Sequence, residues 1–165
     1  MEKNQNEQLA VIRVGGFIEN SCADGPGIRS VLFFQGCNHG CEGCHNPDLH
    51  PAKGGKLFTV AELYEFICQK CRNKKLTISG GEPLEQYDEL LCLIQTLAKD
   101  DFDLCLYTGY SDHKCIPDAI IRHLKYLKTG PYISELRISG RYYGSTNQKF
   151  YKINYKDGDL CTKEI

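Results

Sequence analysis

Short apolar runs alternate with amphipathic helical patterns along most of the 165-residue chain, and this alternation constrains the fold more than any other feature. The runs lie at 10–18, 30–35, 75–79 and 103–109 and are bounded by turn residues, as is typical of buried strands. Strands that alternate with helices are joined in parallel by right-handed crossovers. A closed eightfold barrel needs about 250 residues. We therefore predict a single-domain α/β fold, a partial, open β/α barrel of mostly parallel strands.

Three amphipathic helices are expected between these strands. The first begins after Thr59, which forms a capping box with Glu62. The second spans roughly 85–98, where apolar residues recur at helical spacing. The third begins near Pro117, because proline suits the first turn of a helix.

Charge and hydropathy exclude several classes of function. The 20 Lys and Arg residues nearly balance the 21 Asp and Glu residues, and no basic stripe stands out, so we expect no direct nucleic-acid binding. No apolar run approaches the ~20 residues that a membrane span needs, and the polar start has no signal-peptide stretch. We therefore expect a soluble cytoplasmic protein, with a flexible start at residues 1–9 and one domain over residues 10–165.

Three of the ten cysteines form a cluster, Cys37-Asn-His-Gly-Cys41-Glu-Gly-Cys44, directly after the apolar run 30–35. Thiols stay free in the cytosol, so clustered cysteines indicate metal ligands rather than disulfides. Thiolates are the ligands that iron–sulfur clusters prefer, and loops after strands are where α/β folds place their chemistry. Three ligands on a four-iron cluster leave one iron open to a substrate. We therefore assign Cys37, Cys41 and Cys44 to one 4Fe–4S cluster.

An alternative interpretation of the cluster is a structural zinc site, with His39 or His45 as the fourth ligand. Zinc ligands usually come as two spaced pairs, and the chain has no clear second pair. Cys68 and Cys71 have pair spacing, but they fall on the apolar stripe of the first helix, where we expect core cysteines. No role is assigned to the remaining cysteines, Cys22, Cys92, Cys105, Cys115 and Cys161.

The segment DGPGIRSVLFFQGCNHGCEGCHNPDL at 24–49 and the later Gly80-Gly81-Glu82-Pro83 together resemble the radical S-adenosylmethionine superfamily, and within it the activating enzymes of glycyl-radical proteins. LYTGY at 106–110 and YYGSTNQKFYKI at 142–153 are similar to the subgroup that activates anaerobic ribonucleoside-triphosphate reductases. Some members of that subgroup carry an acidic residue where this chain has Thr129, so no role is transferred to this position.

This resemblance implies an enzyme with two cofactors, one 4Fe–4S cluster and S-adenosylmethionine. It implies reductive cleavage of S-adenosylmethionine to a 5′-deoxyadenosyl radical, which takes a hydrogen atom from a glycine of the reductase's glycyl-radical subunit. A flavodoxin-like protein would supply the electron. Two alternatives stay open: a radical enzyme acting on a small molecule or peptide, and a non-catalytic iron–sulfur module.

The resemblance also implies a cofactor site, with no catalytic residue beyond the cluster and cofactor. The turn after 75–79 would meet the amino group of the methionine moiety, and the turn at 24–27 would position the partner's glycine loop. The segment 145–148 is polar enough to be a surface loop. The residues expected to bind S-adenosylmethionine are Gly43, Cys44, His45, Gly80, Gly81, Glu82 and Thr108.

Overall fold

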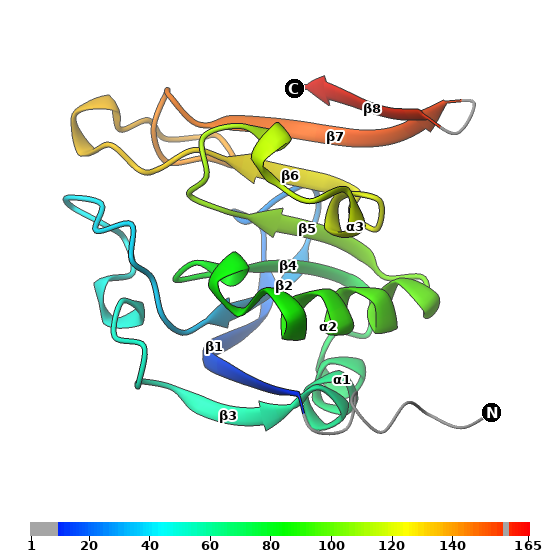
Figure 1. Cartoon of the computed structure of the whole chain (residues 1–165). Coiled ribbons are helices and arrows are strands. Elements are labelled where there is room, and N and C mark those ends of the chain that lie inside the picture. The colour runs from blue at the N-terminus through cyan, green and yellow to red at the C-terminus, as the bar shows by residue number, and fades with distance from the viewer. Residues whose placement is uncertain (1–9, 157–158) are drawn as a thin grey trace.

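A single eight-stranded sheet organises the chain in the computed structural model, which describes residues 10–156 and 159–165 (Figure 1). The strand order is β3-β1-β2-β4-β5-β6-β7-β8, and the sheet does not close. Residues 1–9, expected to be flexible, lie outside the described residues. The strands are β1 (Val11–Ser21), β2 (Arg29–Phe34), β3 (Lys56–Thr59), β4 (Lys75–Gly80), β5 (Asp103–Tyr107), β6 (Tyr126–Thr129), β7 (Lys149–Lys156) and β8 (Asp159–Glu164).

The four central strands, β2, β4, β5 and β6, run parallel to one another, while β1 and β3 on one side and β7 and β8 on the other pair antiparallel. The predicted runs 30–35, 75–79 and 103–109 supply three of the parallel strands, which confirms the open α/β architecture. The antiparallel strands β3, β7 and β8 were not predicted, because their sequences KLFT, KFYKINYK and DLCTKE place polar residues among the apolar ones.

The capping box predicted for the first helix is present. Helix α1 (Val60–Lys70) begins after Thr59, whose side chain accepts from the Glu62 amide at 3.2 Å, while the Glu62 carboxylate accepts from the Thr59 amide at 2.8 Å. The second helix, α2 (Tyr87–Lys99), follows a short 3-10 turn, and the third, α3 (Asp118–Ile121), is a single turn after Pro117. Among the described residues, no helix is long and apolar enough to cross a membrane.

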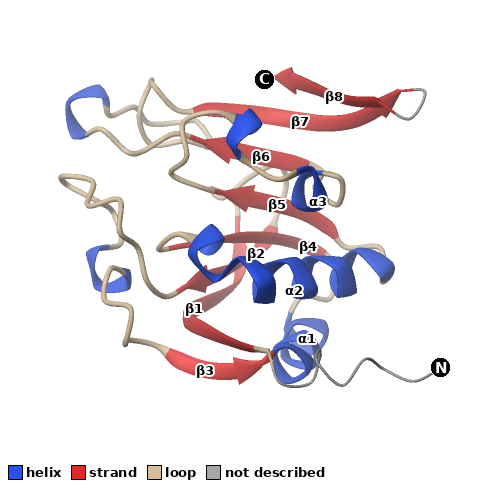
Figure 2. Cartoon of the chain, viewed as in Figure 1, coloured by secondary structure: helices blue, strands red, loops and turns tan. Residues whose placement is uncertain are grey.

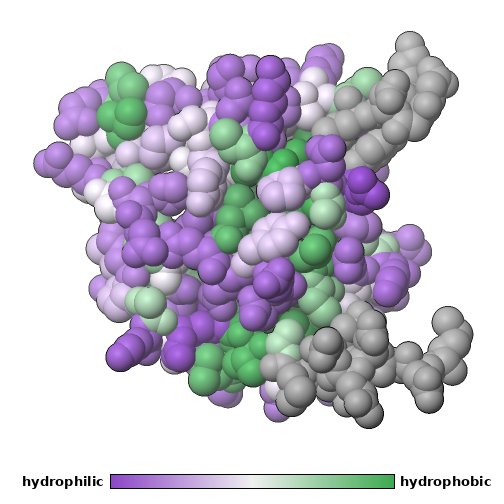
Figure 3. Space-filling model, viewed as in Figure 1, coloured by the Kyte–Doolittle hydropathy of each residue, from purple (hydrophilic) through white to green (hydrophobic). Residues whose placement is uncertain are grey.

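Alternate residues of the parallel strands face opposite sides of the sheet, as strand geometry requires. Leu104 and Leu106 of β5 belong to the main core, which packs beneath the helices (Figure 2). Cys105 and Tyr107 face the other way and pack with Phe150. We call this second side the inner face. Cys71 is fully buried in the main core and Cys68 packs against it, as predicted for core cysteines. The outer surface over the helices carries mostly hydrophilic side chains (Figure 3).

Buried Arg29 closes the amino-terminal end of the inner face. Its guanidinium forms an ion pair with Asp103 at 3.0 Å and donates to the Thr77 hydroxyl at 2.9 Å. The Thr77 hydroxyl in turn donates to the Asp24 carbonyl at 2.6 Å. This network holds the turn at 24–27 against the inner face of the sheet.

Candidate functional site

The cysteine cluster lies on a loop at the carboxyl end of β2, as predicted. The Gly36 amide donates to the Leu49 carbonyl at 2.8 Å, and the Cys37 amide donates to the His50 carbonyl at 3.1 Å. These two bonds bring the ends of the loop together. Between them, Gly40 and Gly43 have φ of 61° and 68°, a left-handed conformation that glycine adopts without strain. The loop is therefore a closed, sharply turning segment that carries three thiols.

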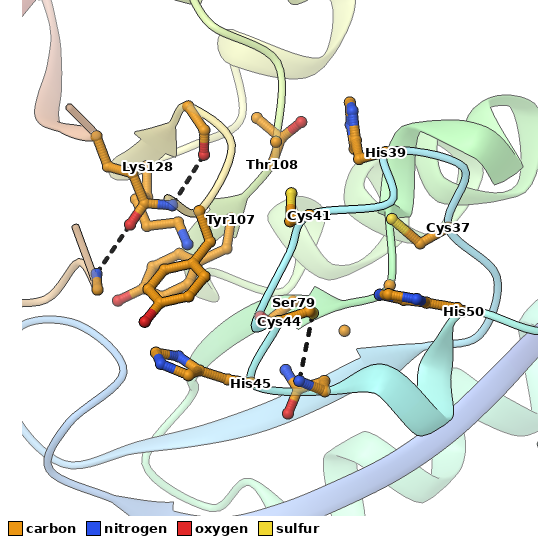
Figure 4. Close-up of a pocket in the computed structure, with 18 residues that line it drawn as sticks. Cys37, His39, Cys41, Cys44, His45, His50, Ser79, Tyr107, Thr108 and Lys128 are labelled. Carbon is orange, nitrogen blue, oxygen red and sulfur yellow. Dashed lines mark hydrogen bonds between the residues drawn. The ribbon is translucent and has the colours of Figure 1, made fainter. Parts of the chain in front are cut away.

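All three thiols line one cavity of about 120 Å³ (Figure 4). None of Cys37, Cys41 and Cys44 is in a disulfide, and each is partly exposed. Among the described residues, no group of three His, Cys, Asp or Glu side chains is placed to hold a single metal ion. In a four-iron cluster each thiolate binds a different iron, so the sulfur atoms lie farther apart than they do around a single ion. Three thiols on one loop that face one cavity are the donor set that such a cluster takes. The site therefore fits such a cluster.

The Gly80-Gly81 turn packs directly against the start of the cysteine loop and lines the same cavity. The Gly81 amide donates to the Phe34 carbonyl at 2.8 Å. A Cβ on Gly81 would lie 2.1 Å from the Gly36 carbonyl oxygen, and a Cβ on Gly80 would lie 2.3 Å from the Phe34 amide nitrogen. The glycines are thus needed for close backbone packing, and this packing leaves their backbone exposed to the cavity.

Glu82 is fully buried behind this turn, and its carboxylate is saturated with hydrogen bonds. Its oxygens accept from the Thr108 hydroxyl at 2.9 Å, from the Gly109 amide at 2.8 Å and from the Leu84 amide at 3.0 Å. His39 Nε2 of the cysteine loop lies 2.9 Å away, and this hydrogen bond raises the pKa of His39. Glu82 therefore joins the end of β5 to the cysteine loop.

The structure brings most of the predicted cofactor residues together. The predicted residues on the cavity wall are Cys44, His45, Gly80, Gly81 and Thr108. Gly43 and Glu82 lie outside the lining of the cavity. Gly43 forms a turn, and a Cβ added to it would lie 3.2 Å from the Ser134 Cβ. Glu82 is buried behind the cavity wall.

A second cavity of about 380 Å³ adjoins the first. Asp24 of the turn at 24–27 lies on its wall, together with Arg141 and aromatic side chains. The predicted site turn therefore faces open space next to the cysteine cavity. The residues that line both cavities are His45, Asn46, Ser79, Tyr107, Lys128 and Gly144.

The far wall of the first cavity comes from the segment between β6 and β7. Gln148 accepts from the Gly144 amide and donates to the Gly130 carbonyl, both at 2.8 Å (Figure 4). Ser145 is fully buried and accepts from the Ile133 amide at 3.2 Å. Within the segment 145–148, Thr146 is exposed, as in a surface loop, while buried Ser145 and Gln148 use their hydrogen bonds to hold the wall together.

Two further cavity residues, Tyr107 and Lys128, were not predicted. They are paired across β5 and β6 and both face inward (Figure 4). Leu104 and Leu106 face the core, and strand alternation therefore places Tyr107 on the opposite face. The sequence pattern of this strand could have predicted that Tyr107 faces the cavity. Lys128 could be found only once the pairing of β6 was known.

A profile described as "4Fe-4S single cluster domain" matches residues 23–151 of the chain. The chain is 30% identical over 135 residues to the anaerobic ribonucleoside-triphosphate reductase-activating protein of Enterobacteria phage T4, an alignment that covers 78% of this chain and 86% of that protein. The protein of the same name from Vibrio cholerae is 29% identical over 140 residues, which covers 78% of this chain and 90% of its own.

Two further similarities extend this picture. The pyruvate formate-lyase-activating enzyme of Clostridium pasteurianum is 32% identical over 120 residues, which span 66% of this chain and 50% of that enzyme. The crystal structure of QueE from Escherichia coli matches with a TM-score of 0.54 at 17% identity, covering 67% of this chain and 59% of that one. The latter similarity concerns the fold.

Proposed function

The chain belongs to the 4Fe–4S single-cluster domain family, and on this premise we propose that it activates an anaerobic ribonucleoside-triphosphate reductase by generating a glycyl radical on it. It is a radical S-adenosylmethionine enzyme of the type that activates glycyl-radical proteins, which confirms the resemblance seen in its motifs. Its cofactors are one 4Fe–4S cluster and S-adenosylmethionine.

In this proposal Cys37, Cys41 and Cys44 hold the cluster. When bound, the cluster supplies the electron that cleaves S-adenosylmethionine to methionine and a 5′-deoxyadenosyl radical. The exposed backbone of Gly80 and Gly81 meets the amino group of the methionine moiety, with Cys44, His45 and Thr108 on the same wall. Gly43 and Glu82 act indirectly. Gly43 shapes the loop, and Glu82 holds Thr108 and His39 in place.

The single observation that carries the proposal is that the three cysteines and the Gly80-Gly81 turn line one cavity, which adjoins a second cavity bordered by Asp24. Exclusion of water protects a radical from side reactions, and the first cavity gathers the cluster ligands and the Gly80-Gly81 turn in one hollow. The second has room for a peptide segment. We assign it to the partner's glycine loop, positioned by the turn at 24–27.

The electron donor and the compartment are part of the same proposal. We propose a flavodoxin-like reductant, since the cluster must be reduced before each cleavage by a protein outside this chain. We also propose a cytoplasmic location, because no disulfide joins the described cysteines, as is typical of a reducing compartment.

An anaerobic assay with the candidate reductase tests the function. The cluster-loaded protein, a reductant and S-adenosylmethionine are incubated with and without the reductase, and 5′-deoxyadenosine and the glycyl radical are measured, the latter by electron paramagnetic resonance. Without the reductase we expect slow cleavage of S-adenosylmethionine. With the reductase we expect deoxyadenosine to form in proportion to the radical and then to stop, because the product is a stored radical. Sustained turnover on a small molecule without any partner would assign the chain to small-molecule chemistry instead.

A further inference from the structure

Lys128 is a cation on the cavity wall for which the site described so far gives no role. It is half-buried on β6 and lines both cavities. Its ammonium lies 4.5 Å from the centroid of the Tyr107 ring, a cation–π contact that holds it in place (Figure 4). Within residues 10–156 and 159–165, no carboxylate forms an ion pair with it.

Lys128 differs from Arg29, the fully buried cation of the described residues, which has a carboxylate partner. Buried Arg29 is paired with Asp103, and exposed Lys70 and Lys74 are also paired with carboxylates. Burial disfavours the charged ammonium of Lys128 and lowers its pKa to about 8. An ammonium withdrawn from water without a counter-ion costs free energy, so the site is arranged to receive an anion.

The position of Lys128 narrows the choice of anion. Tyr107 pairs with Lys128 across β5 and β6. Both side chains line the cavity that the three cysteines line. In the lining of the cysteine cavity, Lys128 is the only Lys or Arg among the described residues. The α-carboxylate is the only anionic group of S-adenosylmethionine, whose ammonium and sulfonium are both cationic.

We propose that Lys128 binds the α-carboxylate of S-adenosylmethionine and that the Tyr107 ring holds its ammonium in position for this contact. This inference rests on the proposed function and adds a specific anchor for the cofactor. The Gly80-Gly81 backbone then binds the ammonium of the methionine moiety, and Lys128 binds the carboxylate of the same moiety. Charge-assisted contacts of this kind are the strong ones in binding sites.

The test compares two ligands, S-adenosylmethionine and its decarboxylated form, on two proteins, the wild type and Lys128→Met. Binding is measured by anaerobic calorimetry on cluster-loaded protein of known iron content. Loss of a charge-assisted hydrogen bond should weaken S-adenosylmethionine binding roughly 10- to 100-fold. The decarboxylated ligand should bind Lys128→Met as well as the wild type, or better, because it carries more positive charge. Lys125→Met, an exposed site three residues earlier, should leave both Kd values unchanged.

Each outcome decides the proposal. An equal loss of affinity for both ligands would mean that Lys128 acts on the cluster or the fold, and unchanged binding of both would mean that it contacts neither; either result overturns the carboxylate assignment. If Lys128→Met loses iron, Lys128→Gln is measured in its place. A ratio of the Kd values for S-adenosylmethionine and its decarboxylated form that equals the wild-type ratio in Lys128→Gln also overturns the carboxylate assignment. Failure of the wild type to bind S-adenosylmethionine would instead overturn the proposed function.

Discussion

His39 Nε2 lies 2.9 Å from Oε2 of Glu82, and this contact joins the cysteine loop to the turn that follows β4. The same carboxylate accepts hydrogen bonds from Thr108 and Gly109 at the end of β5. A single fully buried side chain therefore connects three segments that are far apart in the sequence and that meet at the cavity. The geometry of the cavity depends on this connection.

Glu82→Gln should destabilise the protein although it keeps the shape of the side chain. The amide has one oxygen in place of two and no charge, so the NH2 group must face either the Leu84 amide or the donors at Gly109 and His39, which then lose their acceptor. We expect the free energy of unfolding to fall by about 1.5–3 kcal/mol, as measured by anaerobic urea denaturation. Glu85→Gln is the matched control, because Glu85 bonds Asn38 at an exposed position. Equal effects of the two substitutions would contradict the connecting role of Glu82.

Arg29→Met should be among the most damaging substitutions outside the cavity. It removes the fully buried partner of an ion pair whose other member, Asp103, is partly exposed, and it leaves Asp103 and Thr77 without their donor. The cost should lie between the about 0–1 kcal/mol of an exposed pair and the about 3–5 kcal/mol of a fully buried one. The control is Lys70→Met, which removes an exposed pair with Glu19. Similar urea midpoints for the two variants would show that the Arg29 network does not stabilise the inner face.

Gly81→Ala should lower the iron content of the protein. The new Cβ would lie 2.1 Å from the Gly36 carbonyl oxygen, and Gly36 immediately precedes Cys37. The backbone must move to relieve this clash, and the cysteine loop moves with it. Gly16→Ala is the control, because the nearest atom to its Cβ is a Phe33 ring carbon at 3.8 Å. Wild-type iron content in Gly81→Ala after anaerobic reconstitution would show that the loop tolerates the shift.

Cys105 should resist alkylation in the folded protein. It is fully buried, and burial raises the pKa of its thiol to about 12, so the reactive thiolate is scarce below that pH. At a pH of about 8, iodoacetamide should label exposed Cys22 and Cys115 and leave Cys105 unmodified until the protein is unfolded in urea. Mass spectrometry of the labelled peptides measures this. Early labelling of Cys105 in the native protein would indicate that the inner face opens.

The parts of the fold that depend on local patterns could be predicted from the sequence. Helix α1 was predicted because Thr59 and Glu62 form their capping box within one turn. The cysteine loop was placed correctly because it directly follows an apolar strand. Strands β7 and β8 were not predicted, because antiparallel strands at the side of a sheet alternate polar and apolar residues and are stabilised by a partner strand rather than by full burial.

The candidate site was predictable only on the side built by its motifs. Cys37 and Gly80 belong to motifs that can be recognised in sequence, but Lys128 and Gln148 reach the cavity through pairing between distant strands. Glu82 illustrates a second limit. The motif predicted it as a cofactor-binding residue, yet it lies behind the cavity wall, and its burial and its hydrogen bonds to β5 could be known only once β4 and β5 were side by side.

The cysteine assignment itself can be tested by single substitutions. Replacing Cys37, Cys41 or Cys44 with Ala should each abolish the absorbance of the 4Fe–4S cluster in anaerobically reconstituted protein, because two thiolates do not hold four irons stably.

Cys71→Ala is the control. Cys71 is a buried thiol that caps α1 and lies within the main core, so its loss should cost packing stability of about 1 kcal/mol and leave the spectrum intact. Cys68→Ala, at the edge of that core, should likewise retain the cluster. A cluster that survives Cys44→Ala and disappears in Cys68→Ala would move the metal site from the loop to the helix, and the cavity described above would lose its cofactor.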